Sequence, residues 1–163
     1  MTKTTNRDNF PRFMRLDEAA PLPSRAHDTD AGMDLVAHRL CLPFGNIVDF
    51  DTVKIAPGDS VTFGTGIAVA IPAGNVGLLF ARSSLGVKRR LDLANGTGVI
   101  DASYRGEVML CLRNTSEVVQ YVTRGERIGQ IVITPVILDP WIEDTHLPET
   151  ERGEGGFGST GTV

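Results

Sequence analysis

Short apolar runs alternate with turn-forming residues along most of the chain, so that a turn recurs about every ten residues, as in proteins built from short strands. Residues 53–55 and 60–63 alternate apolar and polar positions with a period of two, which is typical of half-buried strands. The same reasoning predicts further strands at residues 13–16, 33–37, 67–71, 76–80, 108–112, 118–122 and 128–133. Pro57-Gly58-Asp59 and Gly64-Thr65-Gly66 are expected to interrupt them. The pattern predicts an all-β fold, a jelly-roll-like sandwich or barrel.

One stretch departs from the strand pattern. Residues 83–90, Ser-Ser-Leu-Gly-Val-Lys-Arg-Arg, predict a single short helical turn with Ser83 as its N-cap. The free amide groups at the start of such a turn attract anions. An ordinary capped turn with a basic flank is the simpler interpretation of this stretch when it is considered alone.

Length and charge narrow the classes of protein that fit. The 163 residues are enough for one domain with a real core, and the hydrophobic content of 41% is ordinary for a globular protein. A net charge of -4 argues against a general binder of nucleic acids or membrane surfaces, which usually carries a positive excess. The sequence has neither a long apolar run nor the apolar core of a signal peptide, so we expect a cytoplasmic, intracellular protein.

The residues that most often bind metals are scattered. Cys41 and Cys111 stand singly in apolar surroundings, which predicts two reduced, buried thiols. The histidines are too far apart in the sequence to indicate a metal cluster: His27, His38 and His146.

The C-terminal part of the sequence changes character. Residues 135–147 look like a chain leaving the domain, so we divide the protein into a β-domain, 1–140, and a C-terminal arm, 141–163. Residues 152–161 hold five glycines and no aliphatic core residue, and they should stay mobile until something orders them. Glycine-rich backbone amides are suited to wrapping phosphates, and Phe157 could cover a flat ring. A flexible tail without a binding role is the alternative.

Residues 98–107, Gly-Val-Ile-Asp-Ala-Ser-Tyr-Arg-Gly-Glu, combine turn-forming residues with the carboxylate of Asp101 and the aromatic ring of Tyr104. The apolar residues on either side predict a β-hairpin with these two side chains at its tip. Taken alone, the stretch also fits a solvated turn, because polar residues are common in loops.

Five separated segments together resemble the trimeric deoxyuridine triphosphate nucleotidohydrolases, the dUTPases, and they occur in the order of that family's motifs. The segments are Ala31-Gly-Met-Asp-Leu35, Ala81-Arg-Ser-Ser-Leu-Gly86, residues 98–107, Arg124-Gly-Glu-Arg-Ile-Gly-Gln130 and Arg152-Gly-Glu-Gly-Gly-Phe-Gly-Ser-Thr-Gly161. Any one motif is weak, whereas all five span most of the chain. The resemblance implies a dUTPase-like β-clip with one short helix and a flexible glycine-rich tail.

The resemblance also implies roles for the residues on the base and sugar side of a nucleotide. Asp101 corresponds to the general base that activates the attacking water. Tyr104 corresponds to the ring that stacks on the deoxyribose and leaves no room for a 2′-hydroxyl. Asn95, together with hairpin backbone groups at Gly98 and Ile100, corresponds to the group that reads uracil.

Further residues correspond to phosphate contacts. Gln130 corresponds to the glutamine that reaches the α-phosphate, and Asp34 to the carboxylate that holds a water of the Mg²⁺ carried by the triphosphate. The second motif implies phosphate contacts by Arg82, Ser83 and Ser84. In the tail, Arg152 would hold the γ-phosphate and Phe157 would stack on the uracil. The remaining tail residues would line the phosphates: Gly156, Ser159 and Thr160.

The activity implied is hydrolysis of dUTP to dUMP and pyrophosphate, through Mg²⁺-assisted attack of water on the α-phosphorus. This reaction limits uracil incorporation into DNA and supplies dUMP for thymidylate synthesis. The family forms homotrimers whose sites draw on all three chains, so the expected partners are dUTP and two further copies, with no direct nucleic acid and no membrane.

The sequence departs from the family pattern at a few positions. Ser84 stands where many members have glycine, and Glu126 where aspartate is common. Residues 41–52 look longer than the connection expected after the first motif, and they are either a surface loop or a partner-binding insert.

Two rival functions fit the same fold. A dCTP deaminase would be expected to carry a catalytic glutamate near position 111, where this chain has a cysteine. A nucleotide-gated regulatory protein would keep the pocket but act by binding a partner. Ammonia release from dCTP distinguishes the first rival, and a lack of pyrophosphate release from dUTP distinguishes the second.

Overall fold

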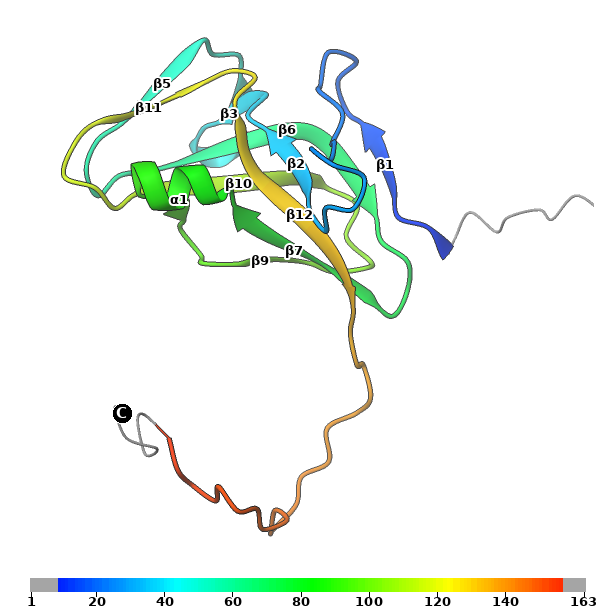
Figure 1. The fold of residues 1–163 in the computed structure, drawn as a ribbon. Helices are drawn as coiled ribbons and strands as arrows, with labels where there is room; N and C mark the ends of the chain where they lie inside the picture. Colours follow the sequence, from blue (N-terminus) through cyan, green and yellow to red (C-terminus); the bar gives the residue numbers. More distant parts are fainter. Residues whose placement is uncertain (1–8, 157–163) are drawn as a thin grey trace, which may run out of the picture.

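The computed structural model describes residues 9–156. The chain forms a sandwich of antiparallel strands, with an arm that runs away from the sheets after the last strand (Figure 1). The residues predicted at Phe157, Ser159 and Thr160 lie outside the described residues.

The larger sheet has six strands. In spatial order it contains β4 (Ile47–Val48), β3 (Arg39–Cys41), β6 (Ser60–Ala70), β10 (Glu107–Asn114) and β8 (Leu91–Leu93), and β1 (Arg12–Arg15) also pairs with β6. The facing sheet has four strands, in the order β2 (Met33–Val36), β12 (Arg127–Pro135), β7 (Asn75–Ala81) and β9 (Gly98–Ile100). A small ribbon pairs β11 (Gln120–Thr123) with β5 (Thr52–Ile55). One α-helix, α1 (Ser83–Arg89), and one 3-10 turn, η2 (Pro43–Gly45), complete the elements described.

The core lies between the two large sheets because alternate side chains of each strand point inward. Phe63 and Leu110 of the six-stranded sheet and Leu35, Leu79 and Ile131 of the four-stranded sheet belong to one buried apolar cluster. The all-β prediction is confirmed, in the form of a sandwich. The sheets of the described region are open and do not close into a barrel.

The predicted interruption at Gly64-Thr65-Gly66 is wrong, since β6 runs unbroken through these residues. The ladder to β10 shifts register between Glu107 and Met109, which pair with Ala68 and Gly64. Extra residues of β6 are therefore accommodated as a bulge, where Gly66 adopts a φ of 69°. Glycine tolerates this left-handed conformation, so it bends the strand here without ending it.

The predicted hairpin at residues 98–107 is also wrong in its pairing. β9 pairs with β7 in the four-stranded sheet, whereas β10 pairs with β6 and β8 in the other sheet. Residues 101–106 thus cross from one layer of the sandwich to the other. A local pattern of apolar runs around a turn does not distinguish such a crossing from a hairpin.

Three smaller expectations are also resolved. Ser83 is the first residue of α1 and not its N-cap, a position that Arg82 takes without a side-chain capping bond. Both cysteines are free, as predicted, but they are half-buried and not fully buried. Residues 41–52 form a surface excursion in which η2 leads from β3 into β4, and β4 pairs back onto β3.

The arm beyond β12 exposes large apolar side chains. Ile137, Trp141 and Ile142 are almost fully exposed, with Trp141 at 101% of its reference area. Among the described residues, no helix is long and apolar enough to cross a membrane.

Candidate active site

A polar pocket lies on the outer face of the four-stranded sheet. Asp34, Gln130 and Phe80 are register partners across β2, β12 and β7, so their side chains share one face of the sheet. They line a cleft of about 360 Å³ together with residues of the first two sequence motifs, among them Ala31, Gly32, Arg82 and Ser83. The first, second and fourth motifs therefore meet within one chain.

Asp34 is the electrostatic centre of this pocket. One of its oxygens lies 3.1 Å from Nε of Arg82, and the other lies 3.0 Å from Nη1 of Arg127. The Asp34 side chain is only 13% exposed, and a carboxylate at such a site needs cationic partners because burial removes its hydration. Asp34 thus fixes two guanidinium groups at the edge of the pocket.

Arg127 contacts the pocket through Asp34 without lining it, and it is not among the residues predicted from the sequence. Alternation along a regular strand would place Arg127 and Gln130 on opposite faces. A register shift between Arg127 and Gly129 inserts an extra residue in β12, and both side chains then reach the outer face. The only sequence signal was the presence of Arg127 inside the fourth motif.

Helix α1 is held at both ends. Leu85 is buried in the core, and the backbone N–H groups of Leu85 and Gly86 donate to the carbonyl of Arg82. At the other end, Arg89 donates to Gln120 and Tyr121 and forms an ion pair with Glu126 of the fourth motif. These contacts fix the turn that carries Ser83, which is exposed at the pocket, and Ser84, which is half-buried and does not line it.

A second cleft, of about 370 Å³, lies where β8 and β10 of the six-stranded sheet come close to β7 and β9 of the four-stranded sheet. It is lined by Asn95 and Gly98, two of the residues predicted to read a base, and by Met109 and Cys111 of β10. Ile100 is half-buried and packs against the core instead. The lining contains no carboxylate.

The loop between β9 and β10 carries Asp101 and Tyr104. The N–H of Tyr104 donates to the carbonyl of Asp101 at 3.0 Å, and the Tyr104 hydroxyl donates to the carbonyl of Glu107 at 2.9 Å. Arg105 donates to the carbonyls of Ala102 and Tyr104. The loop is therefore bonded to itself, while the Asp101 carboxylate is exposed to solvent.

The loop and the polar pocket lie at opposite ends of β7. Ile100 is the register partner of Gly77, so Asp101 follows beside the start of β7, whereas Arg82 follows its end. Six residues of extended strand separate these positions by about 20 Å. One chain does not bring Asp101 to the phosphate-side residues.

The arm places the last described candidates away from both clefts. Residues Arg152 and Gly156 are exposed, and Nε of Arg152 donates to the carbonyl of Gly155 within a turn of the arm. Figure 1 shows the arm extending from the end of β12 away from the sandwich.

The residues present fit a metal ion that enters already bound to a ligand. They fit a metal ion held by protein side chains alone less well. Among residues 9–156, no three His, Cys, Asp or Glu side chains gather closely enough to bind an ion. Both oxygens of Asp34 already have a guanidinium partner, but a carboxylate offers about four acceptor positions. Contact through a water therefore fits Asp34, and this is the mode that Mg²⁺ favours when phosphates supply its other ligands.

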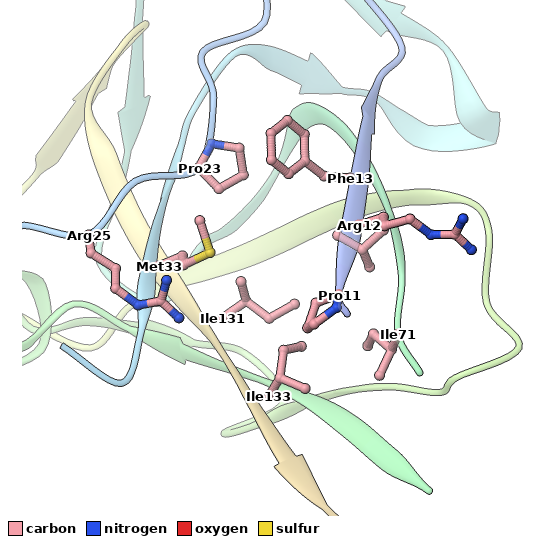
Figure 2. Close-up of a pocket in the computed structure, with 10 residues that line it drawn as sticks. Pro11, Arg12, Phe13, Pro23, Arg25, Met33, Ile71, Ile131 and Ile133 are labelled. Carbon is pink, nitrogen blue, oxygen red and sulfur yellow. The ribbon is translucent and has the colours of Figure 1, made fainter. Parts of the chain in front are cut away.

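A further pocket, of about 290 Å³, lies between β1 and the four-stranded sheet (Figure 2). Its walls are mainly apolar, with Phe13, Met33, Ile71, Ile131 and Ile133 around it. None of the residues predicted to bind a nucleotide lines it, and its apolar walls do not suit a triphosphate.

Comparison with known proteins agrees with the motifs. Residues 18–161 match the model of the dUTPase family. The chain is 44% identical to the deoxyuridine 5′-triphosphate nucleotidohydrolase of Corynebacterium jeikeium, over 99% of both chains.

Solved structures give the same result. A mutant dUTPase of Staphylococcus bacteriophage 80alpha with dUpNHpp superposes with a TM-score of 0.80 and 29% identity, over 94% of this chain and 99% of that one. A mutant dUTPase from phage phi11 of S. aureus, described for the coordination of a structural Mg(II) ion, has a TM-score of 0.71 and 25% identity, over 86% of this chain and 100% of that one. The chain belongs to the dUTPase family.

Proposed function

We propose that the chain hydrolyses dUTP to dUMP and pyrophosphate, the activity for which its relatives are named. The observation that carries the proposal is the polar pocket in which Asp34, Arg82, Ser83 and Gln130 meet, because these four residues come from three separate motifs. A pocket with guanidinium groups and a mostly polar lining suits a triphosphate.

The phosphate chain binds in this pocket. Arg82 and Arg127, fixed by Asp34, neutralise phosphate charge, and Gln130 donates an amide N–H to the α-phosphate. Mg²⁺ carried by the triphosphate would supply further charge neutralisation, and Asp34 would hold it through a water. Asp101 accepts the proton of the water that attacks the α-phosphorus, and pyrophosphate leaves.

The base binds in the cleft beside Asn95. Uracil offers an acceptor, a donor and an acceptor along one edge, and Asn95 with the backbone at Gly98 and Ile100 supplies matching groups. Cytosine inverts two of these positions, so it would leave buried polar groups unpaired and be rejected. Tyr104 stacks on the deoxyribose and excludes a 2′-hydroxyl.

The separation of the two half-sites supports a shared site. Asp101 lies beside the start of β7 and Arg82 follows its end, about 20 Å apart. A single triphosphate spans less than that, so the loop of one copy must face the polar pocket of another. A homotrimer meets this requirement with three equivalent sites.

The arm completes the site from a further copy. Its exposed Ile137, Trp141 and Ile142 are apolar groups that a neighbouring copy would cover. Arg152 then reaches the γ-phosphate and Phe157 covers the uracil, while the other tail residues line the phosphates: Gly156, Ser159 and Thr160. Closure of the tail excludes bulk water from the reaction.

The test is a nucleotide panel with Mg²⁺, in which dUTP, dCTP, dTTP and UTP are compared and pyrophosphate and ammonia are both measured. The expected result is pyrophosphate from dUTP, with little from the other three and no ammonia. Ammonia from dCTP would replace hydrolysis with deamination, and binding of dUTP without any product would favour a regulatory protein.

A further inference from the structure

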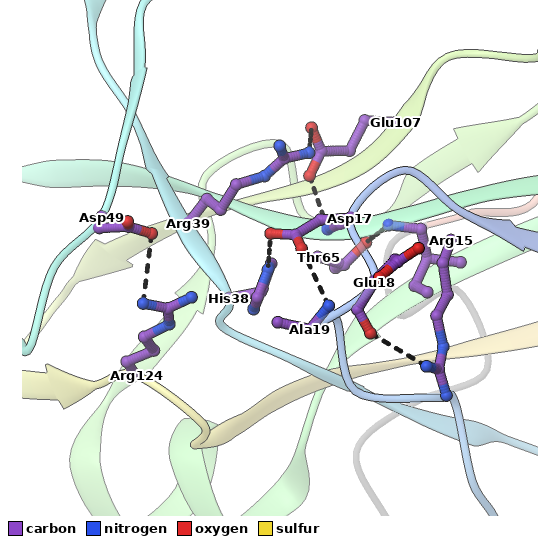
Figure 3. Close-up of polar contacts among 12 residues, drawn as sticks. Arg15, Asp17, Glu18, Ala19, His38, Arg39, Asp49, Thr65, Glu107 and Arg124 are labelled. Atoms are coloured by element: carbon purple, nitrogen blue, oxygen red, sulfur yellow. Dashed lines mark hydrogen bonds and ion pairs between the residues drawn. The ribbon is translucent and has the colours of Figure 1, made fainter.

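A buried carboxylate lies directly behind the loop that carries Asp101 and Tyr104. The Glu107 side chain is 8% exposed, and both of its oxygens are bonded (Figure 3). Oε1 accepts the backbone N–H of Gly66 at 2.6 Å, and Oε2 accepts from Nη2 of Arg39 at 2.9 Å. Glu107 therefore ties the first residue of β10 to β6 and β3.

These bonds form where the ladder between β10 and β6 is irregular and does not fix the first residues of β10. The pairing of β10 with β6 is regular from Arg113 to Met109 and shifts register before Glu107. The backbone pairing that fixes Met109 against β6 therefore does not fix Glu107 as well. The bonds of the Glu107 side chain, with the hydroxyl of Thr65 donating to the carbonyl of Val108, span this break.

The Glu107 carboxylate fits closely between its neighbours, and this arrangement has an energetic cost. A Cβ on Gly64 would lie 2.5 Å from Oε1 of Glu107, so a larger residue at position 64 would displace it. Among the described residues, Nε of Arg39 is buried without a hydrogen-bond partner. A buried N–H group without a partner is unfavourable. The ion pair with Glu107, and not the pairing of every donor of Arg39, therefore fixes the position of the Arg39 side chain.

The same residue holds the loop through its backbone. The carbonyl of Glu107 accepts the Tyr104 hydroxyl, and the N–H of Tyr104 in turn donates to the carbonyl of Asp101. A chain of bonds thus runs from Arg39 and Gly66 through Glu107 to Tyr104 and Asp101. Small displacements of reacting groups are costly, because a misplacement of about 1 Å can lower a rate about a hundredfold.

We propose that Glu107 is a positioning residue, which through the bulge of β6 and through Arg39 sets where Tyr104 and Asp101 stand against the nucleotide. The proposal rests on the proposed function, since it assigns Glu107 a part in the same site. Glu107 does not touch the nucleotide itself. Its loss loosens the loop and moves the Tyr104 ring, which admits a 2′-hydroxyl and misplaces the Asp101 carboxylate.

The test compares Glu107→Ala and Glu107→Gln with Thr65→Val. Thr65→Val is the control, because it removes the bond from Thr65 to Val108 in the same bulge and keeps both bonds of the Glu107 carboxylate, to Gly66 and to Arg39. The readouts are kcat with dUTP, the ratio of kcat/KM for dUTP over UTP, and deuterium uptake of the peptide that contains residues 101–107. The ratio does not depend on how much of the sample is folded.

Glu107→Ala should lower the dUTP to UTP ratio about tenfold and raise uptake in the loop peptide. Glu107→Gln should fall between this variant and the wild type, since an amide oxygen still accepts the N–H of Gly66. Thr65→Val should keep the wild-type ratio and loop uptake. An unchanged ratio and uptake in Glu107→Ala, or an equal change in Thr65→Val, overturns the proposal.

The exchange readout separates this proposal from the proposed function. If the wild type releases no pyrophosphate from dUTP but Glu107→Ala alone loosens residues 101–107, the activity assignment fails and the anchoring by Glu107 stands. If dUTP is hydrolysed and neither variant of Glu107 alters loop exchange or selectivity, the activity stands and the positioning role fails.

Discussion

Two carboxylates of this chain stand in opposite electrostatic settings. Asp34 is nearly buried between the guanidinium groups of Arg82 and Arg127, whereas the Asp101 side chain is exposed and has no bonded partner among the described residues. A carboxylate held by two cations fixes the positions of those cations. An exposed carboxylate without a bonded partner can contact a water directly. Under the proposed function, the two halves of the site therefore divide the work between charge neutralisation and proton transfer.

Removal of the Asp101 charge should have the largest effect. Asp101→Asn keeps the size of the side chain but loses the proton acceptor, so kcat for dUTP should fall by about 10²- to 10⁴-fold. Binding of a non-hydrolysable imido analogue of dUTP, measured by calorimetry, should stay close to that of the wild type. Asp59→Asn, at an exposed turn residue between β5 and β6, is the control. Unchanged turnover in Asp101→Asn would remove Asp101 from the role of base.

Mixed oligomers test the division between copies. Asp101→Asn and Arg82→Leu each disable one half-site, so each variant alone should be nearly inactive. When the two are refolded together, about a quarter of the sites should pair an intact loop from one copy with an intact pocket from another, as random assembly of a symmetric oligomer requires. Pyrophosphate release by the mixture should recover to that fraction. A mixture that forms mixed oligomers by native mass spectrometry but stays inactive would place both half-sites in one chain.

The arginine found only in the structure should have a smaller effect. Arg127→Leu leaves Asp34 with a single partner, Arg82, which is then drawn toward the carboxylate and away from phosphate. The loss of one charged hydrogen bond predicts a fall in kcat/KM for dUTP of about tenfold. Arg124→Leu is the matched control. Arg124 stands three residues before Arg127 in the same motif, and it pairs with the exposed Asp49. Equal effects of the two substitutions would make Arg127 an ordinary surface cation.

The sequence predicted most strands because alternation and turn residues are local signals. Residues 53–55 and 76–80 lie within β5 and β7, as expected. Asp34 and Gln130 were named from motifs far apart in the sequence, and register pairing between β2 and β12 places them side by side. The resemblance to the dUTPase motifs thus pointed to these pocket residues without any knowledge of their distances.

The errors share a physical cause, which is that bulges and sheet assignments depend on partners distant in sequence. The Gly64–Gly66 stretch was expected to end a strand, but Glu107 and Thr65 fasten the bulge to β10. Arg127 is not predicted because a bulge in β12 places its side chain on the face opposite to the one that regular alternation gives. The sequence around Asp101 predicts a hairpin because the pairing of β9 with β7 leaves no signal in the loop itself.

The smallest effect on turnover is expected at the hydrogen bond between Asp17 and His38. This contact supports the stability of the fold and not the reaction. Asp17 accepts a hydrogen bond from the buried His38 at 2.7 Å, and this bond, followed by the N–H of Ala19, holds the pKa of Asp17 below its ordinary value of 3.8. A carboxyl whose pKa is lowered by folding contributes stability above pH 3.8, and this contribution is lost as the pH falls through the folded value. Asp17→Asn should therefore melt slightly below the wild type at pH 6, and the difference in Tm should shrink as the pH falls below 3.8. Turnover of dUTP should stay within about twofold of the wild type, because Asp17 contacts neither half-site. A Tm difference that is the same at pH 3 and pH 6 would show that the Asp17 charge does not stabilise the fold.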